Sequence, residues 1–132
     1  MSREIYWLTL TLAATALFCL PYVLNRVAVR GLMGTLANPS PDEKPLAAWA
    51  QRAQKAHANA TENLVLFAPA VMAVQLTGRA DVLTASACAI YFFARIAHYV
   101  VYTLGIPGAR TLAWTAGWLA TLALIGRVLG LL

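Results

Sequence analysis

IYWLTLTLAATALFCLPYVLN, residues 5–25, is a run of 21 residues without one formally charged side chain. As an α-helix this stretch is long enough to cross the roughly 30 Å hydrocarbon core of a bilayer. A cleaved signal peptide is the alternative interpretation, but its apolar region usually has about 7 to 15 residues and precedes a small-x-small cleavage site. Residues 5–25 fit neither property, so they predict a membrane-spanning helix.

The composition of the whole chain agrees with a membrane protein. Of its 132 residues, 61% are hydrophobic and 11% are charged, and the mean hydropathy is +0.67, whereas soluble domains carry about 25% charged residues. The basic residues that give the net charge of +5 lie beside apolar stretches and not in one basic run. They therefore reflect membrane topology and do not predict a nucleic-acid partner. Cys19 and Cys88 form no CxxC, and His57 and His98 lack metal-ligand spacing, so no metal site is predicted.

The pattern predicts four helices, at about 5–30, 46–77, 82–104 and 109–131, in one domain covering residues 1–132. Pro21 is expected to kink the first helix because it removes one backbone hydrogen bond. Residues 33–45, rich in proline and polar side chains, predict an exposed loop, while residues 78–81 and 105–108 predict tight turns. The predicted fold class is therefore all-α, an integral membrane four-helix bundle.

The distribution of basic residues predicts the orientation of the bundle. Four crossings place both termini on one side of the membrane. The end with the long loop carries six basic residues against three at the other end, and basic residues gather on the cytoplasmic side. The six are Arg26, Arg30, Lys44, Arg52, Lys55 and Arg110, and the three are Arg3, Arg79 and Arg127. We therefore expect a cytoplasmic loop and outward-facing termini, in a bacterial inner membrane or its equivalent.

Polar residues inside the apolar helices are the candidates for function, because a charge at the bilayer centre costs about 2.5 to 3.5 kcal/mol even on lenient scales. Helical spacing places two sets on single stripes. The first is Arg52, Lys55, Asn59 and Glu62, and the second is Tyr91, Arg95, His98 and Tyr102. The stripes are expected to face one another or a hydrated cleft, where Glu62 and Arg95 neutralise each other.

Two interpretations of these stripes remain open. A buried Glu62–Arg95 pair can simply fix helix packing or subunit register. Alternatively, the stripes line a binding site, which Arg110 at the start of the fourth helix favours. A basic residue there opposes the helix dipole, so stability alone would favour an acidic one, whereas arginine beside a helix N-terminus suits an anion.

The two stripes also resemble motifs of the MAPEG proteins, membrane-associated proteins in eicosanoid and glutathione metabolism. Residues 55–63, KAHANATEN, are similar to the family's basic-Ala-x-x-Asn-x-x-Glu motif, and residues 95–102, RIAHYVVY, are similar to its Arg-x-x-His/Tyr-x-x-x-Tyr motif. The chain departs from some animal members at Ala58, where they carry arginine, and at Lys55, where others have arginine. The resemblance covers nearly the whole chain and implies a homotrimer of four-helix subunits.

The resemblance also implies a site and an activity. It implies a glutathione transferase or peroxidase that uses glutathione as co-substrate and acts on lipophilic electrophiles or hydroperoxides. Arg110 would be the catalytic residue that stabilises the glutathione thiolate. The glutathione-binding residues would be Arg26, Lys55, Asn59, Glu62, Arg95, His98 and Tyr102.

Two other functions remain open at the level of the sequence. One is a non-enzymatic protein of the same fold that binds lipid or a partner protein. The other is a small four-helix transporter similar to the small multidrug resistance family. That family uses an intramembrane glutamate on its first helix, without an arginine partner. A cavity lined by Arg95 and Lys55 would be a poor environment for its cationic drugs.

Overall fold

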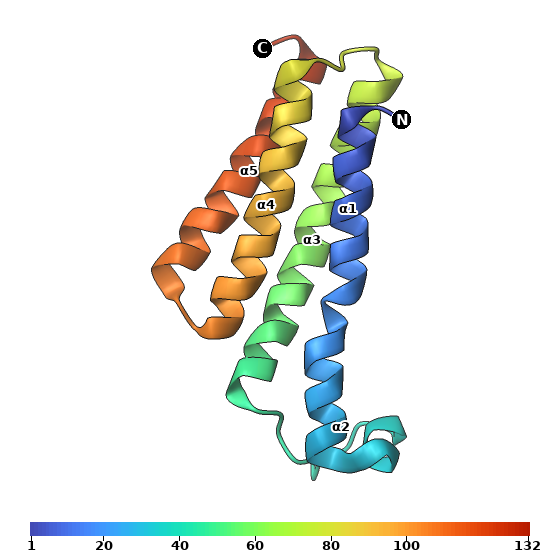
Figure 1. Cartoon of the computed structure of the whole chain (residues 1–132), viewed down its shortest axis with the longest axis vertical. Helices are drawn as coiled ribbons and strands as arrows, with labels where there is room; N and C mark the ends of the chain where they lie inside the picture. The colour runs from blue at the N-terminus through green and yellow to red at the C-terminus, as the bar shows by residue number, and fades with distance from the viewer.

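The computed structural model describes all 132 residues, and α-helices are its only regular secondary structure. Five segments follow one another along the chain: α1 (Arg3–Leu17), α2 (Cys19–Leu36), α3 (Ala48–Leu76), α4 (Val82–Leu104) and α5 (Pro107–Leu129). Because α1 and α2 continue each other, the molecule is a bundle of four antiparallel rods with both termini at one end (Figure 1). The all-α bundle predicted from the sequence is confirmed.

The break between α1 and α2 lies at Phe18, one turn before the kink predicted at Pro21. Proline has no N–H to donate to the carbonyl four residues earlier, and its ring crowds that carbonyl, so the helix is disrupted in the preceding turn. The Phe18 carbonyl accepts a hydrogen bond from the Tyr99 hydroxyl (2.9 Å). The Phe18 and Tyr99 rings also stack, with centroids 4.0 Å apart. The break is therefore stabilised from α4.

The end of α2 bends sharply at Gly31, whose φ of 72° lies in the left-handed region. The sequence predicts a helix end at about residue 30, and the structure adds another turn, up to Leu36, in a new direction. Arg30 fixes the loop that follows, because it pairs with Glu43 (3.0 Å) and donates a hydrogen bond to the Lys44 carbonyl (2.8 Å).

The other helix ends follow the local sequence closely. Asp81 and Thr84 form a capping box at the start of α4, and α4 spans 82–104 as predicted. The α5 helix begins at Pro107, two residues before the predicted start, because proline is well suited to the first helical position. The α3 helix spans Ala48–Leu76 against the predicted 46–77.

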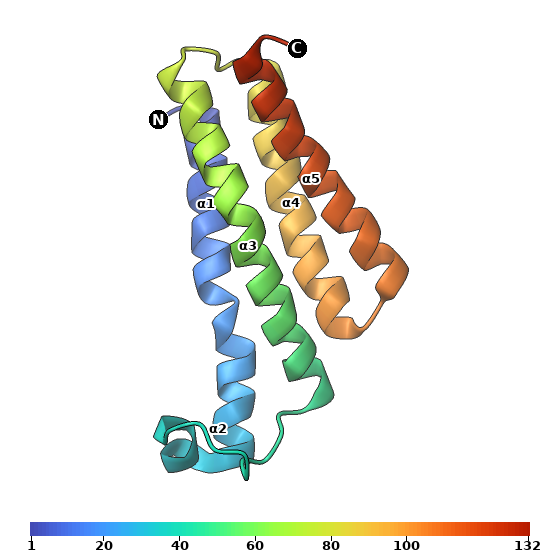
Figure 2. The ribbon, with the colours of Figure 1, turned by 180° about the vertical axis from the view of Figure 1, so that it is seen from behind.

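Three stretches of the chain are long and apolar enough to cross a membrane: Arg3–Leu36, Val82–Leu104 and Pro107–Leu129. The α3 helix falls outside this set, since its N-terminal half is polar. It nevertheless packs against both the α1–α2 rod and the α4–α5 hairpin, and it returns the chain from the end of α2 to the start of α4 (Figure 2). The chain is therefore an integral membrane protein, and connectivity requires α3 to cross with the other rods.

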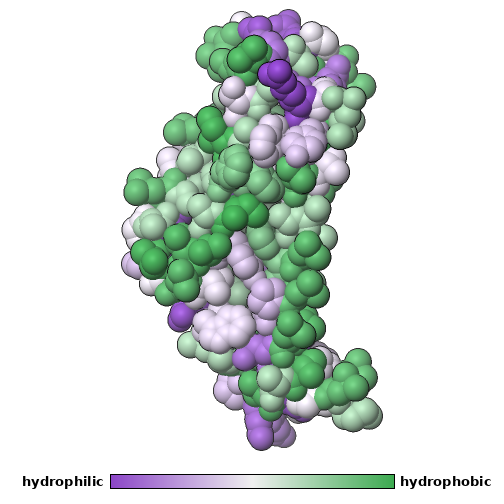
Figure 3. Space-filling model, in the orientation of Figure 1, coloured by the Kyte–Doolittle hydropathy of each residue, from purple (hydrophilic) through white to green (hydrophobic).

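The two ends of the bundle are more hydrophilic than its middle, and the helices do not all extend equally far toward the end opposite the termini. Hydrophobic residues cover most of the middle of the face in Figure 3, and hydrophilic ones gather at its upper and lower ends. The α3 helix has 29 residues and α4 and α5 have 23 each, so α3 is longer by about 9 Å. The α4–α5 hairpin therefore ends before the α2–α3 end of the bundle.

The core occupies the half of the bundle near the termini. Phe67 of α3 and Tyr91 of α4 stack there with ring centroids 3.6 Å apart, and Val71, Val74 and Leu124 are fully buried beside them. Toward the other end the buried positions of α4 become polar, at Arg95 and His98. The change from an apolar to a polar interior locates the candidate site.

Candidate functional site

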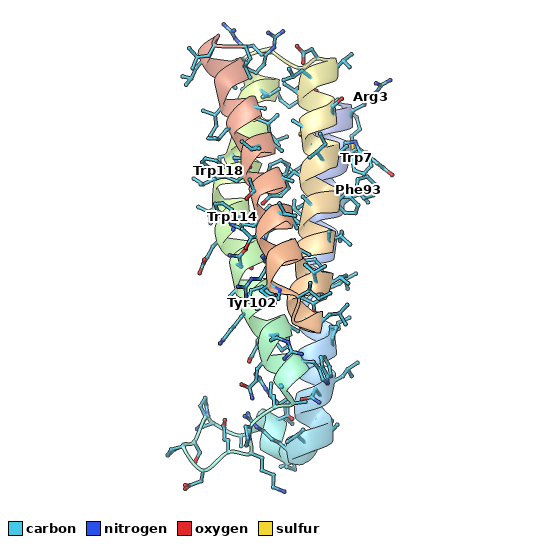
Figure 4. All side chains as sticks on the ribbon, turned by 90° about the vertical axis from the view of Figure 1, so that its left-hand side faces the viewer. Arg3, Trp7, Phe93, Tyr102, Trp114 and Trp118 are labelled. Atoms are coloured by element: carbon cyan, nitrogen blue, oxygen red, sulfur yellow. The ribbon has the colours of Figure 1, made fainter.

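A cavity of about 360 Å³ opens between α3, α4 and α5. Its lining comes from all three helices: Asn59, His98, Tyr102, Arg110, Thr111 and Trp114. Figure 4 shows Tyr102, Trp114 and Trp118 along one side of the bundle, away from Arg3, Trp7 and Phe93. Four of the eight predicted site residues line this cavity, and Arg95 lies directly behind them.

Arg95 is a buried cation whose partners within the chain are neutral. Only 3% of the residue is exposed. One terminal nitrogen donates to Asn59 Oδ1 (2.7 Å) and lies 3.4 Å from His98 Nδ1, while Nε is buried without a partner. The predicted α4 stripe therefore does face α3, but the charge of Arg95 is not neutralised there.

The predicted pairing of Glu62 with Arg95 is wrong within the chain. Glu62 is exposed, and neither of the two ion pairs in the structure includes it. Glu62 lies about 60° around α3 from Asn59, and in the structure that offset places Glu62 on the exposed side of α3 while Asn59 contacts Arg95. Asn59 takes the position that the sequence assigned to the glutamate.

Arg110 lies in the first turn of α5, and its guanidinium carbon is 4.6 Å from the centroid of the Tyr102 ring. This is a cation–π distance. No carboxylate lies within ion-pair distance of Arg110. In addition, the α5 N-terminus has no side-chain cap, so its free N–H groups add to the positive potential. Arg95 and Arg110 therefore make the cavity cationic, which suits an anionic ligand.

Three predicted site residues lie outside this cavity in the single chain. Lys55 and Glu62 are exposed on α3. Arg26 instead lines a separate cavity of about 470 Å³ with Arg30, Gln51 and Gln54, where its Nε is buried without a partner. The two cavities share no lining residue. In one chain the predicted site residues are therefore divided between two separate cavities and the exposed face of α3, and they do not form one closed site.

Two lining residues, Thr111 and Trp114, are not among the site residues predicted from the sequence. The signal that could have found them is the position of Trp114, four residues after Arg110 and three after Thr111, because both spacings place residues side by side on a helix. The Trp114 ring stacks on Trp118, with centroids 5.9 Å apart. His57 belongs to neither cavity, because it faces Tyr22, whose hydroxyl lies 2.7 Å from His57 Nδ1.

Comparison with known proteins assigns the chain to a family. No curated protein and no solved structure matches the chain. A sequence model of the MAPEG family matches residues 5–130, nearly the full length of 132 residues. The match spans all five helical segments and every residue of the cationic cavity. The chain therefore belongs to the MAPEG family.

Proposed function

We propose that the protein is a membrane-bound glutathione-dependent transferase or peroxidase that acts on lipophilic electrophiles or hydroperoxides. The observation that supports this most strongly is the cationic cavity, which Arg110 lines and behind which Arg95 lies, because neither arginine has a carboxylate partner. Glutathione carries two carboxylates and a thiol that must ionise to react. Its chemistry therefore complements the charge of the cavity.

The predicted site residues have separate roles in this proposal. Arg95 and the amide of Asn59, which already contact each other, would hold the polar backbone of the tripeptide. His98 and Tyr102 would form the wall beside it. Arg110 would lie against the sulfur, supported by the uncapped start of α5. The carboxylate of Glu62 and the ammonium of Lys55 would complete the polar contacts.

The energetic demand on Arg110 is moderate. A free thiol titrates near pH 8.5, so most of it is protonated at neutral pH. Lowering the pKa by two units requires about 2.7 kcal/mol of differential stabilisation, which one close cation and a helix N-terminus can supply in a partly dry cleft. The thiolate then attacks an electrophilic carbon and displaces its leaving group. No protein nucleophile is required.

Hydroperoxide reduction follows from the same thiolate. Its sulfur attacks the peroxide oxygen, the O–O bond breaks, and the alkoxide takes a proton to become an alcohol. The resulting sulfenic acid of glutathione condenses with a second glutathione to give the disulfide and water. The protein contributes binding and orientation to both reactions.

A homotrimer would complete the site. Glu62 and Lys55 are exposed on α3 next to its apolar half, and charged side chains facing lipid are costly. A neighbouring copy that covers this face would shield them and could bring the Arg26 cavity against the cavity that contains Arg110. We further propose that the loop end faces the cytoplasm of a bacterial inner membrane, with both termini outside.

A glutathione titration of the detergent-purified protein tests the proposal. We expect thiolate absorbance to grow with glutathione and to saturate. We also expect turnover of a chloronitrobenzene or of a lipid hydroperoxide. S-methylglutathione is the control, because it has no ionisable thiol and should compete without giving absorbance. A protein that gives neither absorbance nor turnover would be better described as a non-enzymatic, lipid- or partner-binding member of the family.

A further inference from the structure

Arg52 lies on α3 outside the cavity, and it joins α3 to the end of α4. Its Nε–H donates a hydrogen bond to the Thr103 carbonyl (2.9 Å). Thr103 belongs to the last turn of α4, where carbonyls have no partner within the helix, and a cation at this end also complements the helix dipole. Arg52 therefore caps a helix that is 51 positions away in sequence.

The guanidinium of Arg52 also packs against Gly105, the residue that ends α4. Gly105 has a φ of 80°, and a Cβ added there would lie 3.3 Å from Arg52 Nε and 3.4 Å from Cζ. Both the left-handed conformation and the close approach favour glycine at this position. Arg52 therefore contacts the turn through a hydrogen bond and through packing.

The turn fastened in this way leads directly to Arg110. After Gly105 and Ile106 the α5 helix begins, and the Arg110 N–H donates to the Ile106 carbonyl (3.2 Å). Tyr102, which lies under the Arg110 guanidinium, is the neighbour of Thr103. Both sides of the cation–π contact are therefore within a few residues of the contacts made by Arg52.

We propose that Arg52 is a positioning residue, which locks the α4–α5 turn to α3 and thereby holds Arg110 over the cavity. Its effect on catalysis rests on the proposed function, whereas its effect on the turn does not. Arg52 acts through Arg110 and is absent from the cavity lining.

The chain offers a matched control at its opposite end. Arg79 donates a hydrogen bond to the Arg127 carbonyl in the last turn of α5 (3.3 Å). That helix ends at Gly130, whose φ is 75° and whose added Cβ would lie 3.5 Å from Arg79 Nη1. Arg79 thus makes the same kind of cap far from the candidate site.

Hydrogen exchange in detergent tests whether Arg52 holds the turn. In Arg52→Gln, the amides of Gly105, Ile106 and Arg110 should exchange about fivefold to tenfold faster, the factor expected from losing about one hydrogen bond. In Arg79→Gln, the increase should move to Gly130 and Leu131, whose amides bond within the α5 cap. Unchanged exchange at residues 105–110 in Arg52→Gln would overturn the proposal.

The pKa of the bound glutathione thiol tests whether the position of Arg110 depends on Arg52. Arg52→Gln and Arg52→Lys should both raise it relative to the parent and to Arg79→Gln. Lysine keeps the charge but cannot reproduce the flat guanidinium. A raised value in Arg52→Gln with a parental value in Arg52→Lys would show that only the charge matters, and would overturn positioning. A parental thiol pKa in both Arg52→Gln and Arg52→Lys would also overturn positioning.

Failure of the proposed function and failure of the proposal for Arg52 give different results. A parent protein that gives no thiolate absorbance overturns the proposed function, and the exchange data still decide whether Arg52 fastens the turn. If Arg52→Gln does not fold, Arg52→Lys carries both measurements, because it retains a donor and the charge while it loses the packing on Gly105.

Discussion

Arg110 is a cation that faces an aromatic ring and an open cavity, with no carboxylate to neutralise it. Most arginines of the chain have clear structural partners. Arg30 and Arg127, for example, form ion pairs with Glu43 and Asp81. An unpaired arginine at the start of a helix opposes the helix dipole, so stability does not explain its position. The anionic ligand that we propose would explain it.

Replacing Arg110 with alanine should separate binding from activation. Arg95 and Asn59 remain in Arg110→Ala, so glutathione should still bind, but the pKa of its thiol should rise by up to about two units, a loss of about 2.7 kcal/mol. At pH 7 a rise of the thiol pKa from about 6.5 to about 8.5 corresponds to a decrease in the thiolate fraction of roughly 25-fold. Thiolate absorbance against pH, together with calorimetric binding, measures both quantities.

The control is Arg3→Ala, which removes one positive charge near the N-terminus, away from the cavity (Figure 4). It should leave the titration of the bound thiol unchanged. Equal thiolate absorbance in Arg110→Ala and the parent would exclude this role for Arg110.

At the scale of elements, the break between α1 and α2 depends on a contact from α4. The Tyr99 hydroxyl donates to the Phe18 carbonyl, which lies at the turn that Pro21 disrupts. Tyr99→Phe should keep the ring stacking and lose only this hydrogen bond, at a cost of about 1 kcal/mol. Thermal unfolding in detergent measures the loss. Tyr6→Phe is the matched control, because the Tyr6 hydroxyl makes no hydrogen bond and the residue is 46% exposed.

The start of α4 should make the stability depend on pH. The Thr84 N–H, followed by the Arg127 guanidinium, keeps the pKa of Asp81 below its ordinary value. A lowered pKa in the folded state gives stability that is present above the unfolded-state pKa of about 3.9, and it is lost as the pH falls through the folded value. The parent should therefore lose stability below about pH 4.

Asp81→Asn is the variant that checks this dependence. Asparagine can still cap α4 but cannot pair with Arg127 (2.5 Å in the parent). The variant should be less stable than the parent at pH 7, and the difference should disappear at low pH. Melting temperatures between pH 3 and pH 7 provide the measurement, and a difference that stays constant over this range would contradict the assignment to Asp81.

The same elements show what could be predicted from the sequence and what could not. Asp81 and Gly105 mark the ends of α4, so its bounds follow from local chemistry, and the spacing of Arg95, His98 and Tyr102 correctly placed them on one face. Spacing within a helix does not give the rotation of one helix against another. Asn59 instead of Glu62 therefore meets Arg95. The additional turn after Gly31 depended on one backbone conformation, which the sequence pattern does not specify.

At the scale of the whole molecule, the charged face of α3 is the main argument for self-association. Glu62→Gln should leave the bundle folded, because the carboxylate has no partner within the chain, but it should weaken assembly or glutathione binding. Native mass spectrometry of the detergent-solubilised protein and a glutathione titration measure the two effects. Asp42→Asn, an exposed change in the loop, is the control. A variant with parental assembly and affinity would indicate that Glu62 contacts neither glutathione nor a neighbouring copy.

The α4–α5 hairpin stops short of the α2–α3 end of the bundle, and Arg110 lies on the first turn after its tip. If α2 and the loop reach the aqueous phase, the hairpin tip lies near the boundary between the aqueous phase and the hydrocarbon core of the membrane. A hydrophilic tripeptide would then enter from one phase and an oily molecule from the other. Two reactants with no common solvent could therefore meet at the hairpin tip, and neither would have to leave its own medium.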